Sequence, residues 1–234
     1  MKKERIWEID ALRGFLIVCM VIVHFVIGAQ MFFPLFTLPV WLEAIMMRAG
    51  TLFVIVSGLS ATLGTRTVRR GIIVFCCGLG LQLACYLAVL LGIFGSEMVI
   101  RFGVLHLLGV SMMLWPLVKD AKPWQLLIAA AIIIGLGYWF ETFYVTPKFL
   151  FAFGLITRDF GSGDFYPLFP EFGWFLVGGA LGKLLYAEKK SLLPTVNGNC
   201  APLRFLRFCG RNSLAIYLVH LPLIGGILML ISLL

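Results

Sequence analysis

The chain has 234 residues, of which 61% are hydrophobic and only 13% are charged, and its mean hydropathy is +1.02. A soluble domain has about 45–50% apolar and about 25% charged residues, so this chain could not bury its apolar side chains in one water-soluble core. The composition excludes disordered, collagen-like and disulfide-rich proteins. It predicts an all-α integral membrane protein, because helices satisfy every backbone hydrogen bond within lipid.

Seven apolar stretches are long enough, or nearly long enough, to cross a bilayer as helices. A hydrocarbon core about 30 Å thick needs about 20 residues at about 1.5 Å of rise per residue. The fourth, fifth and sixth stretches are shorter, and tryptophans near their ends fit interfacial positions that would let them span. We expect one polytopic bundle of about seven transmembrane helices in a single domain, residues 1–234. The predicted spans are 13–33, 41–64, 71–95, 102–118, 124–140, 172–187 and 211–234.

The distribution of basic residues predicts the orientation. If the N-terminus lies in the cytoplasm, alternation over seven crossings places 15 of the 19 Lys and Arg residues on the cytoplasmic side. Basic residues gather in cytoplasmic loops of membrane proteins, so the C-terminus is expected outside. The net charge of +8 then reflects topology, and no nucleic-acid partner is expected. The basic residues left outside are Arg48, Arg101, Lys148 and Arg158.

The first span carries ionisable residues, which are costly in a membrane and are therefore candidates for function. Arg13 and His24 are 11 residues apart, so on a helix they differ by about 20° in azimuth and about 16 Å along the axis. Asp10 lies one turn before Arg13 on the same side. One face thus carries a carboxylate, a guanidinium and an imidazole. The alternative is a structural histidine bound by a neighbouring helix.

The last span contains a second polar group of residues. Ser213, Tyr217 and His220 follow one helix face at i, i+4 and i+7 spacing. Asn212 stands where a helix N-cap is expected. These residues could form a site, or they could join helices through hydrogen bonds as polar residues commonly do in membranes.

The middle of the chain supplies the remaining candidates. His106 lies nearer the outer surface, where it is structural or borders an access path, and Arg101 faces either a polar acceptor or the membrane interface. Arg66, Arg69 and Arg70 follow the second span on the cytoplasmic side. They could bind a phosphorylated cosubstrate or act only as topology anchors.

The longest external connection, residues 141–171, mixes aromatic side chains with carboxylates. Such a mixture suits a sugar or amine acceptor, although an ordinary aromatic belt has the same composition. Its apolar piece, Phe149–Ile156, is too short to span. The six cysteines lack zinc-ligand spacing, and no nucleotide-binding or metalloprotease motif is present, so neither a metal nor a soluble-type cofactor site is predicted.

Several of these segments resemble known membrane acyltransferases. RIWEIDALRGFLIVCMVIVH is similar to the first span of transmembrane acyltransferases, in which an Arg-x10-His pattern carries the catalytic histidine. LFVIVSGLSA and the following Arg66-x-x-Arg69 resemble the Phe-Ser-Gly segment and RxxR motif of integral-membrane O-acyltransferases. RFGVLHLLGVS and GRNSLAIYLVHLPL resemble the catalytic domain of heparan-α-glucosaminide N-acetyltransferase and its small bacterial relatives. The resemblance covers about half of the chain. Residues 28–41, where that enzyme has its reactive histidine, contain no His, so His24 follows the O-acyltransferase pattern.

The resemblance implies an enzyme of the plasma (inner) membrane of bacteria that moves an acetyl group from cytosolic acetyl-CoA to a hydroxyl or amine. The acceptor would be an externally exposed glycan or glycolipid, and the sequence leaves a homodimer open. His24 is expected to act as general base or to accept the acyl group, while His220, Ser213 and Tyr217 orient the acceptor or stabilise the oxyanion. Asp10 is expected to hold Arg13 in place. The residues expected at the CoA phosphates are Arg13, Arg66, Arg69 and Arg70, and those expected at the acceptor also include Arg101 and His106.

Two other functions are alternatives to acyl transfer. A transporter or proton-relay protein could pass protons through His24 and His220, although no inverted repeat is visible. A non-catalytic membrane partner would need none of the buried polar groups. Acyl transfer accounts for most of the motifs.

The basic-residue count generates a prediction about topology. A reporter fused after Leu234 is expected to behave as external, and one inserted near Lys189 as cytoplasmic. Enzymatic reporters that are active on only one side of the membrane provide the measurement. If both fusions report the same side, the orientation is wrong.

Overall fold

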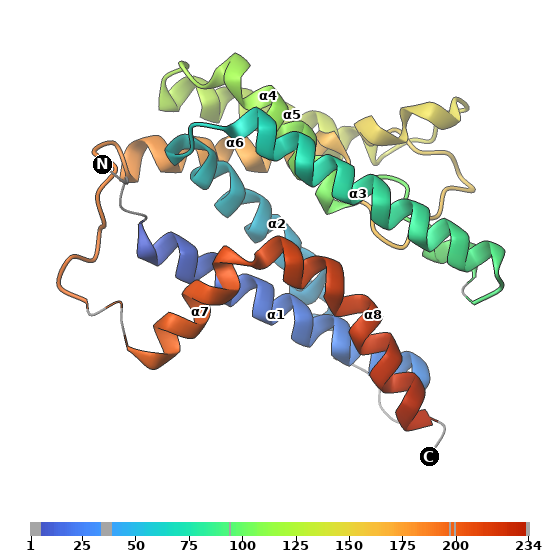
Figure 1. Cartoon of the computed structure of the whole chain (residues 1–234). Coiled ribbons are helices and arrows are strands. Elements are labelled where there is room, and N and C mark those ends of the chain that lie inside the picture. Colours follow the sequence, from blue (N-terminus) through green and yellow to red (C-terminus); the bar gives the residue numbers. More distant parts are fainter. Residues whose placement is uncertain (1–5, 34–38, 94, 197, 199, 233–234) are drawn as a thin grey trace. The chain divides into compact units, whose positions relative to one another are not determined.

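The computed structural model describes residues 6–33, 39–93, 95–196, 198 and 200–232. Lys2, Lys3 and Arg5, together with the ends of the third and seventh predicted spans, lie outside the described residues. No strand is present in the described part, and Phe102 and Phe165 form an isolated bridge. The helices are α1 (Trp7–Phe32), α2 (Val40–Leu63), α3 (Thr67–Leu90), η1 (Ser96–Met98), α4 (Val104–Val118), α5 (Pro123–Phe140), η2 (Lys148–Phe153), α6 (Leu168–Leu185), α7 (Ala201–Arg211) and α8 (Ser213–Ser232) (Figure 1).

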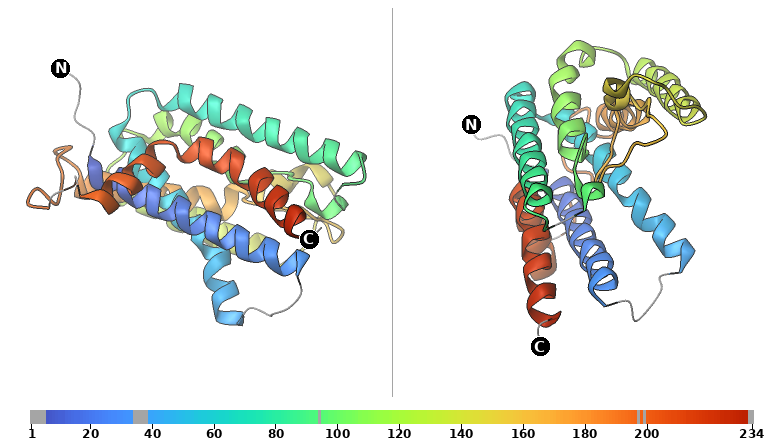
Figure 2. Two further views of the ribbon diagram at one scale, coloured as in Figure 1. Left: turned by 60° about the horizontal axis from the view of Figure 1, so that its bottom comes forward. Right: turned by 90° about the vertical axis from the view of Figure 1, so that its right-hand side faces the viewer.

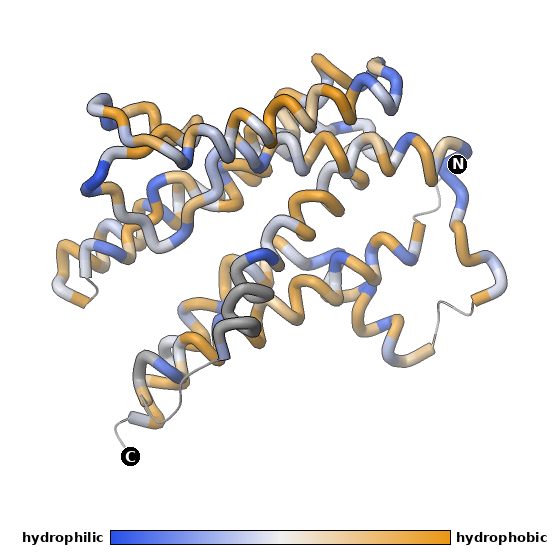
Figure 3. The backbone as a smooth tube through the Cα atoms, turned by 180° about the vertical axis from the view of Figure 1, so that it is seen from behind, coloured by the Kyte–Doolittle hydropathy of each residue, from blue (hydrophilic) through white to orange (hydrophobic). Residues whose placement is uncertain are grey.

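Five of these helices are long and apolar enough to cross a membrane, namely α1, α3, α5, α6 and α8. Two shorter apolar helices, Arg48–Leu63 and Val104–Val118, correspond to the second and fourth predicted spans. Hydrophobic residues dominate most of the helices in Figure 3. The prediction of an all-helical membrane protein is confirmed, whereas the count of seven spans and the orientation stay predictions.

The chain divides into two compact units, and the division falls within α2. The first unit contains residues 1–53 and 188–234, and the second contains residues 54–187. Both ends of the chain therefore belong to the first unit. That the whole chain acts as one functional domain stays a prediction.

The first unit is built on a close contact between α1 and α7. A Cβ atom on Gly14 would overlap the carbonyl oxygen of Leu206, and one on Gly210 would overlap the carbonyl oxygen of Asp10. The two backbones therefore touch directly, which only small residues allow. At the other end of α1, Gly28 packs beside Leu228 of α8.

These contacts show that α1 and α8 run in the same direction, side by side (Figure 2). Residues near the start of α1 touch α7, which directly precedes α8, while Gly28 near the end of α1 touches residues of the last turns of α8. The parallel arrangement belongs to the first unit alone, and the number of membrane crossings and the side of each terminus stay predictions.

The second unit joins α3 to α4, and α5 to α6. The last part of α2 lies against α6, where a Cβ atom on Gly58 would overlap the carbonyl of Phe175. Phe175 and the buried Trp115 of α4 fill the interior, with ring centroids 6.1 Å apart. At the start of α4, the Val104 N–H donates a hydrogen bond to Asp164 Oδ2 at 3.0 Å.

Three local features differ from the sequence prediction. Helix α1 begins at Trp7, several residues before the predicted span, because a polar first turn continues the helix beyond the hydrocarbon region. The short apolar piece at residues 149–156 contributes to the 3-10 helix η2. Helix α7 is not among the predicted spans, because it alternates basic and aromatic residues and contains no apolar run.

The backbone contact between α1 and α7 generates a stability prediction. Gly210→Val is expected to destabilise the fold by about 1–3 kcal/mol or more, because the added atoms meet a carbonyl that cannot move aside. Gly225→Val is the matched control on α8, since no described atom lies within 4 Å of a Cβ placed there. Thermal unfolding of the purified protein in detergent measures both. Equal stability of the two variants would contradict the contact.

Candidate active site

The structure brings His24 and His220 together within the first unit. Their ring centroids are 4.8 Å apart and the ring planes meet at 81°, so the edge of one imidazole faces the other. Both side chains lie on helices that are expected to cross the membrane, well inside the ends of α1 and α8. The sequence placed each histidine within an expected span, and the structure adds that they are in contact.

Each imidazole is held by a carbonyl of its own helix. His24 Nδ1 lies 2.9 Å from the carbonyl oxygen of Met20, and His220 Nδ1 bonds to the carbonyl oxygen of Tyr217. A carbonyl oxygen can only accept, so each Nδ1 carries the hydrogen and donates it. When either ring is neutral, its lone pair is therefore on Nε2, the atom that can take a proton or attack a carbon.

The two Nε2 atoms differ in their surroundings. His220 is only 3% exposed, and its Nε2 makes no hydrogen bond to any described residue. His24 is half-buried, which leaves its ring more accessible to a ligand. A neutral His220 in this tautomer has no Nε2 hydrogen to offer an oxyanion, so the geometry favours its use as a proton acceptor.

The other predicted residues of α8 lie along the same helix. The Tyr217 ring is 5.3 Å from the His220 ring and is tilted by 53°. Ser213 is the first residue of α8, two turns before His220, and is half-buried. Tyr217 is thus close enough to touch a group bound at His220, while Ser213 marks the helix start.

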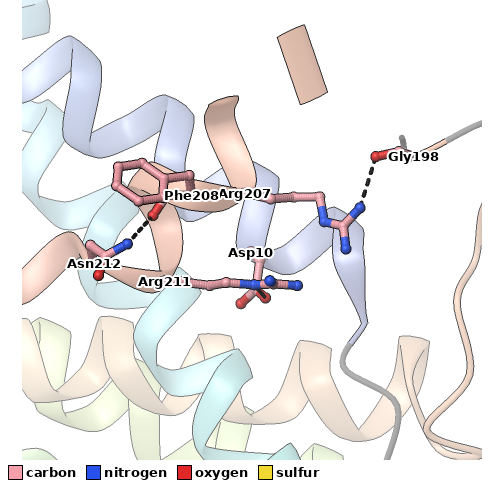
Figure 4. Close-up of polar contacts among 6 residues, drawn as sticks. All are labelled: Asp10, Gly198, Arg207, Phe208, Arg211 and Asn212. Carbon is pink, nitrogen blue, oxygen red and sulfur yellow. Dashed lines mark hydrogen bonds and ion pairs between the residues drawn. The ribbon is translucent and has the colours of Figure 1, made fainter. Parts of the chain in front are cut away.

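Asp10 is buried and forms an ion pair with Arg211, a residue absent from the predicted site. Arg211 Nε donates to Asp10 Oδ2 at 3.2 Å, and the two side chains are 42% and 11% exposed (Figure 4). The sequence analysis assigned Asp10 to Arg13, which is half-buried on the same helix. The partner on α7 could have been suspected from the basic residues there, but its position beside Asp10 depends on the fold.

The junction of α7 and α8 is fixed by further polar contacts. The Asn212 side chain donates from Nδ2 to the carbonyl of Phe208 at 2.8 Å, and Arg207 Nη1 donates to the carbonyl of Gly198 at 2.9 Å (Figure 4). Asn212 was predicted as an N-cap of the last span. Its backbone carbonyl does accept the Ile216 N–H at 3.0 Å, but its side chain closes the end of α7 instead.

The arginines predicted to hold CoA are divided between the two units. Arg13 belongs to the first unit, and Arg66, Arg69 and Arg70 belong to the second. All three arginines of the second unit are exposed, where α2 ends and α3 begins. Their grouping into one phosphate site stays a prediction.

Arg101 and His106 also lie in the second unit. The Arg101 guanidinium lies 5.3 Å from the centre of the Phe160 ring, a cation–π contact. The Gly103 N–H donates to His106 Nδ1 at 3.3 Å. His106 Nδ1 therefore accepts a hydrogen bond, whereas Nδ1 donates one in His24 and His220. His106 packs against Phe75 of α3 with ring centroids 5.5 Å apart, which supports the structural interpretation.

Two residues of the connection between α5 and α6 were not among the predicted site residues. Asp164 binds the first turn of α4, as described above, and Tyr166 lies among described acidic residues. Burial raises the pKa of Tyr166, and the carboxylates of Asp164 and Glu171 raise it further. The sequence signal that could have identified Asp164 is a carboxylate within an aromatic segment. Among the described residues, no cluster of three or more His, Cys, Asp or Glu could hold a metal ion.

Together these observations define a polytopic helical membrane protein with two imidazoles in contact between α1 and α8. The family model described as "Heparan-alpha-glucosaminide N-acetyltransferase, catalytic" matches residues 5–222, which include both histidines. The chain therefore belongs to this family, and the resemblance seen in the sequence is confirmed. No curated protein and no solved structure matches the chain.

The Asp10–Arg211 pair generates a prediction for the first unit. Asp10→Asn and Arg211→Gln are each expected to lower stability by about 1–3 kcal/mol, because each leaves a charged partner without its hydrogen bond. The double variant should lose less than the sum of the two. Equilibrium unfolding in mixed micelles provides the measurement.

Glu188→Gln is the matched control, because it breaks an ion pair with Lys190 in which both side chains are more than three-quarters exposed. Exposed pairs contribute about 0–1 kcal/mol, so little change is expected. Strict additivity of Asp10→Asn and Arg211→Gln would show that the two side chains do not interact.

Proposed function

We propose that the protein is a membrane-embedded acyltransferase that moves an acetyl group from cytosolic acetyl-CoA to a hydroxyl or amine. The acceptor is a glycan or glycolipid exposed on the opposite side of the membrane. The observation that carries the proposal is the contact between His24 and His220, each with its Nε2 lone pair available. Membership in an acetyltransferase family supports the choice of reaction.

The imidazole pair supplies the base that acyl transfer requires. In direct transfer, one Nε2 takes the proton of the acceptor hydroxyl or amine as the acceptor attacks the thioester carbonyl carbon. The carbon–sulfur bond then breaks, and the CoA thiolate leaves and takes up the proton. General-base catalysis of this kind contributes about 10²–10⁴-fold to the rate.

The same pair also supports a covalent route. His24 Nε2 attacks the thioester carbon, the carbon–sulfur bond breaks, and the acetyl group remains on His24 as an acetyl-imidazolium. Its Nδ1–H stays bonded to the Met20 carbonyl throughout. His220 Nε2 then takes the acceptor proton while the acceptor attacks the acetyl carbon, so the carbon–nitrogen bond breaks and His24 returns to its neutral form. The thiolate finally receives the proton from His220.

Acetyl-CoA is proposed to approach from the side on which α1 begins. Arg13 is 11 residues before His24 on α1, a rise of about 16 Å, which an extended pantetheine arm could bridge. Guanidinium groups bind phosphates through strong paired hydrogen bonds. We therefore assign Arg13 to the CoA phosphates, with Arg66, Arg69 and Arg70 as further candidates.

A proton relay is the second candidate function, and the same contact favours it. Two imidazoles with centroids 4.8 Å apart could exchange a proton, and ionisable residues within spans often serve transport. A pH-sensitive dye inside proteoliposomes distinguishes the two functions. Proton flux without acetyl transfer would favour the relay.

The central prediction concerns His24. His24→Ala is expected to lower acetyl transfer by at least about 10²–10⁴-fold while acetyl-CoA still binds, because the variant loses the accessible Nε2 but none of the proposed phosphate contacts. Transfer of radiolabelled acetyl to membrane glycolipids, measured with purified protein, tests this.

His220→Ala is expected to be impaired less severely, since His24 retains its own Nε2 for base catalysis. Both variants are first compared with the parent protein in thermal unfolding, because each removes a helix contact. A well-folded His24→Ala protein with near-normal transfer would refute the mechanism. An acetyl label trapped on His24 would select the covalent route over direct transfer.

A further inference from the structure

Helix α7 presents a mixed basic and aromatic face that is largely exposed within the first unit. Phe205 is 58% exposed and Phe208 is 63% exposed, and Arg204 and Arg211 are also exposed. At about 100° per residue, Arg204, Phe208 and Arg211 lie on one side of the helix. The opposite side carries the buried Gly210, which packs on α1. The exposed face is therefore a fixed surface, because its reverse side is held by backbone contact.

All charged residues in and just before α7 are basic. Residues 189–212 contain no Asp or Glu. Arg207 and Arg211 have partners within the first unit, whereas the described structure gives no side-chain partner to the exposed Arg204. Such a segment attracts anionic surfaces, with each Lys or Arg contributing about 1 kcal/mol near an anionic membrane. Its basic residues are Lys189, Lys190, Arg204, Arg207 and Arg211.

The position of α7 in the chain points to the same surface. Only Asn212 separates α7 from α8, which is long and apolar enough to span the membrane. Helix α7 therefore lies where the chain enters the bilayer. Amphipathic helices that lie in this plane insert aromatic side chains between lipid headgroups and keep basic side chains at the phosphates. Phe205, Phe208 and Arg204 provide both types of contact.

We propose that α7 is an in-plane helix that binds anionic phospholipid headgroups at the membrane surface. Arg204 contacts the lipid phosphate, assisted by the outer part of the Arg211 guanidinium, and Phe205 and Phe208 insert at the boundary of the acyl chains. This surface is separate from the histidine pair and does not depend on acetyl transfer. On this proposal the basic residues of α7 bind lipid phosphates and not the phosphates of CoA.

The test uses the full chain, purified and delipidated in detergent, with phosphatidylglycerol as the anionic probe and phosphatidylcholine of the same chain length as the neutral one. Native mass spectrometry measures the dissociation constant of the first bound lipid. Arg204→Gln is expected to weaken phosphatidylglycerol binding about fivefold, the equivalent of about 1 kcal/mol, and to leave phosphatidylcholine unchanged. Arg204→Lys should retain most of the affinity.

Lys119→Gln is the matched control, because Lys119 is an exposed basic residue at the end of α4, on the side predicted to be cytoplasmic. It should leave phosphatidylglycerol binding unchanged. The double variant Phe205→Ser with Phe208→Ser should weaken binding of both lipids, since it removes the apolar contacts. All of these side chains are exposed, and thermal unfolding checks that each variant remains folded.

Three results would overturn the proposal. The first is unchanged phosphatidylglycerol affinity in Arg204→Gln. The second is an equal loss in Lys119→Gln, which would show attraction to overall charge rather than to α7. The third is weaker acetyl-CoA binding by Arg204→Gln with normal lipid binding, which would assign the helix to the cosubstrate. Absence of acetyl transfer in every variant and in the parent protein would bear on the proposed enzyme alone.

Discussion

The direct backbone contact between Gly14 and the end of α7 is the constraint on which the first unit depends. It fixes where α1 lies along the pair formed by α7 and α8, and the Asp10–Arg211 ion pair holds the same crossing. His24 follows Gly14 by ten residues, and His220 follows Gly210 by ten residues. From these glycines the chain reaches His24 within α1, and it reaches His220 across the junction of α7 and α8. The imidazoles meet at the far ends of these two paths of equal length, although neither glycine contacts a histidine.

Contact between the histidines has an electrostatic consequence. Two like charges about 4–5 Å apart repel by about 3–4 kcal/mol at the effective dielectric constant typical of proteins. An acetyl-imidazolium on His24 is likewise a positive charge, and it disfavours a second positive charge on His220. In the proposed covalent route, His220 therefore gains the acceptor proton only as the acceptor's attack returns His24 to its neutral form.

The helices and the candidate histidines could be predicted from the sequence, because long apolar runs and ionisable residues within them are local signals. The contact between His24 and His220 could not, since the two residues are almost the full length of the chain apart and no local pattern pairs their helices. The glycines at 14 and 210 were also uninformative alone, because small residues are common in membrane helices. Helix α7 does show amphipathic periodicity, but a search for apolar runs passes over it. The relation of Arg13 to Arg66, Arg69 and Arg70 depends on how two separate units assemble.

On the proposal that α7 lies in the membrane plane, this helix connects the membrane surface to the interior of the first unit. Its polar contacts, through Asn212 and Arg211, tie the start of α8 to α1, so the three helices are fixed to one another where the chain enters the bilayer. A helix that rests on lipid headgroups defines a depth, and residues of α8 lie at fixed rises from it. On this proposal His220, about 10 Å of helical rise beyond the first residue of α8, would lie within the hydrocarbon core. The proposed acyl transfer then requires the thioester to reach this pair from the side on which α1 begins, where the buried Nε2 of His220 is shielded from water.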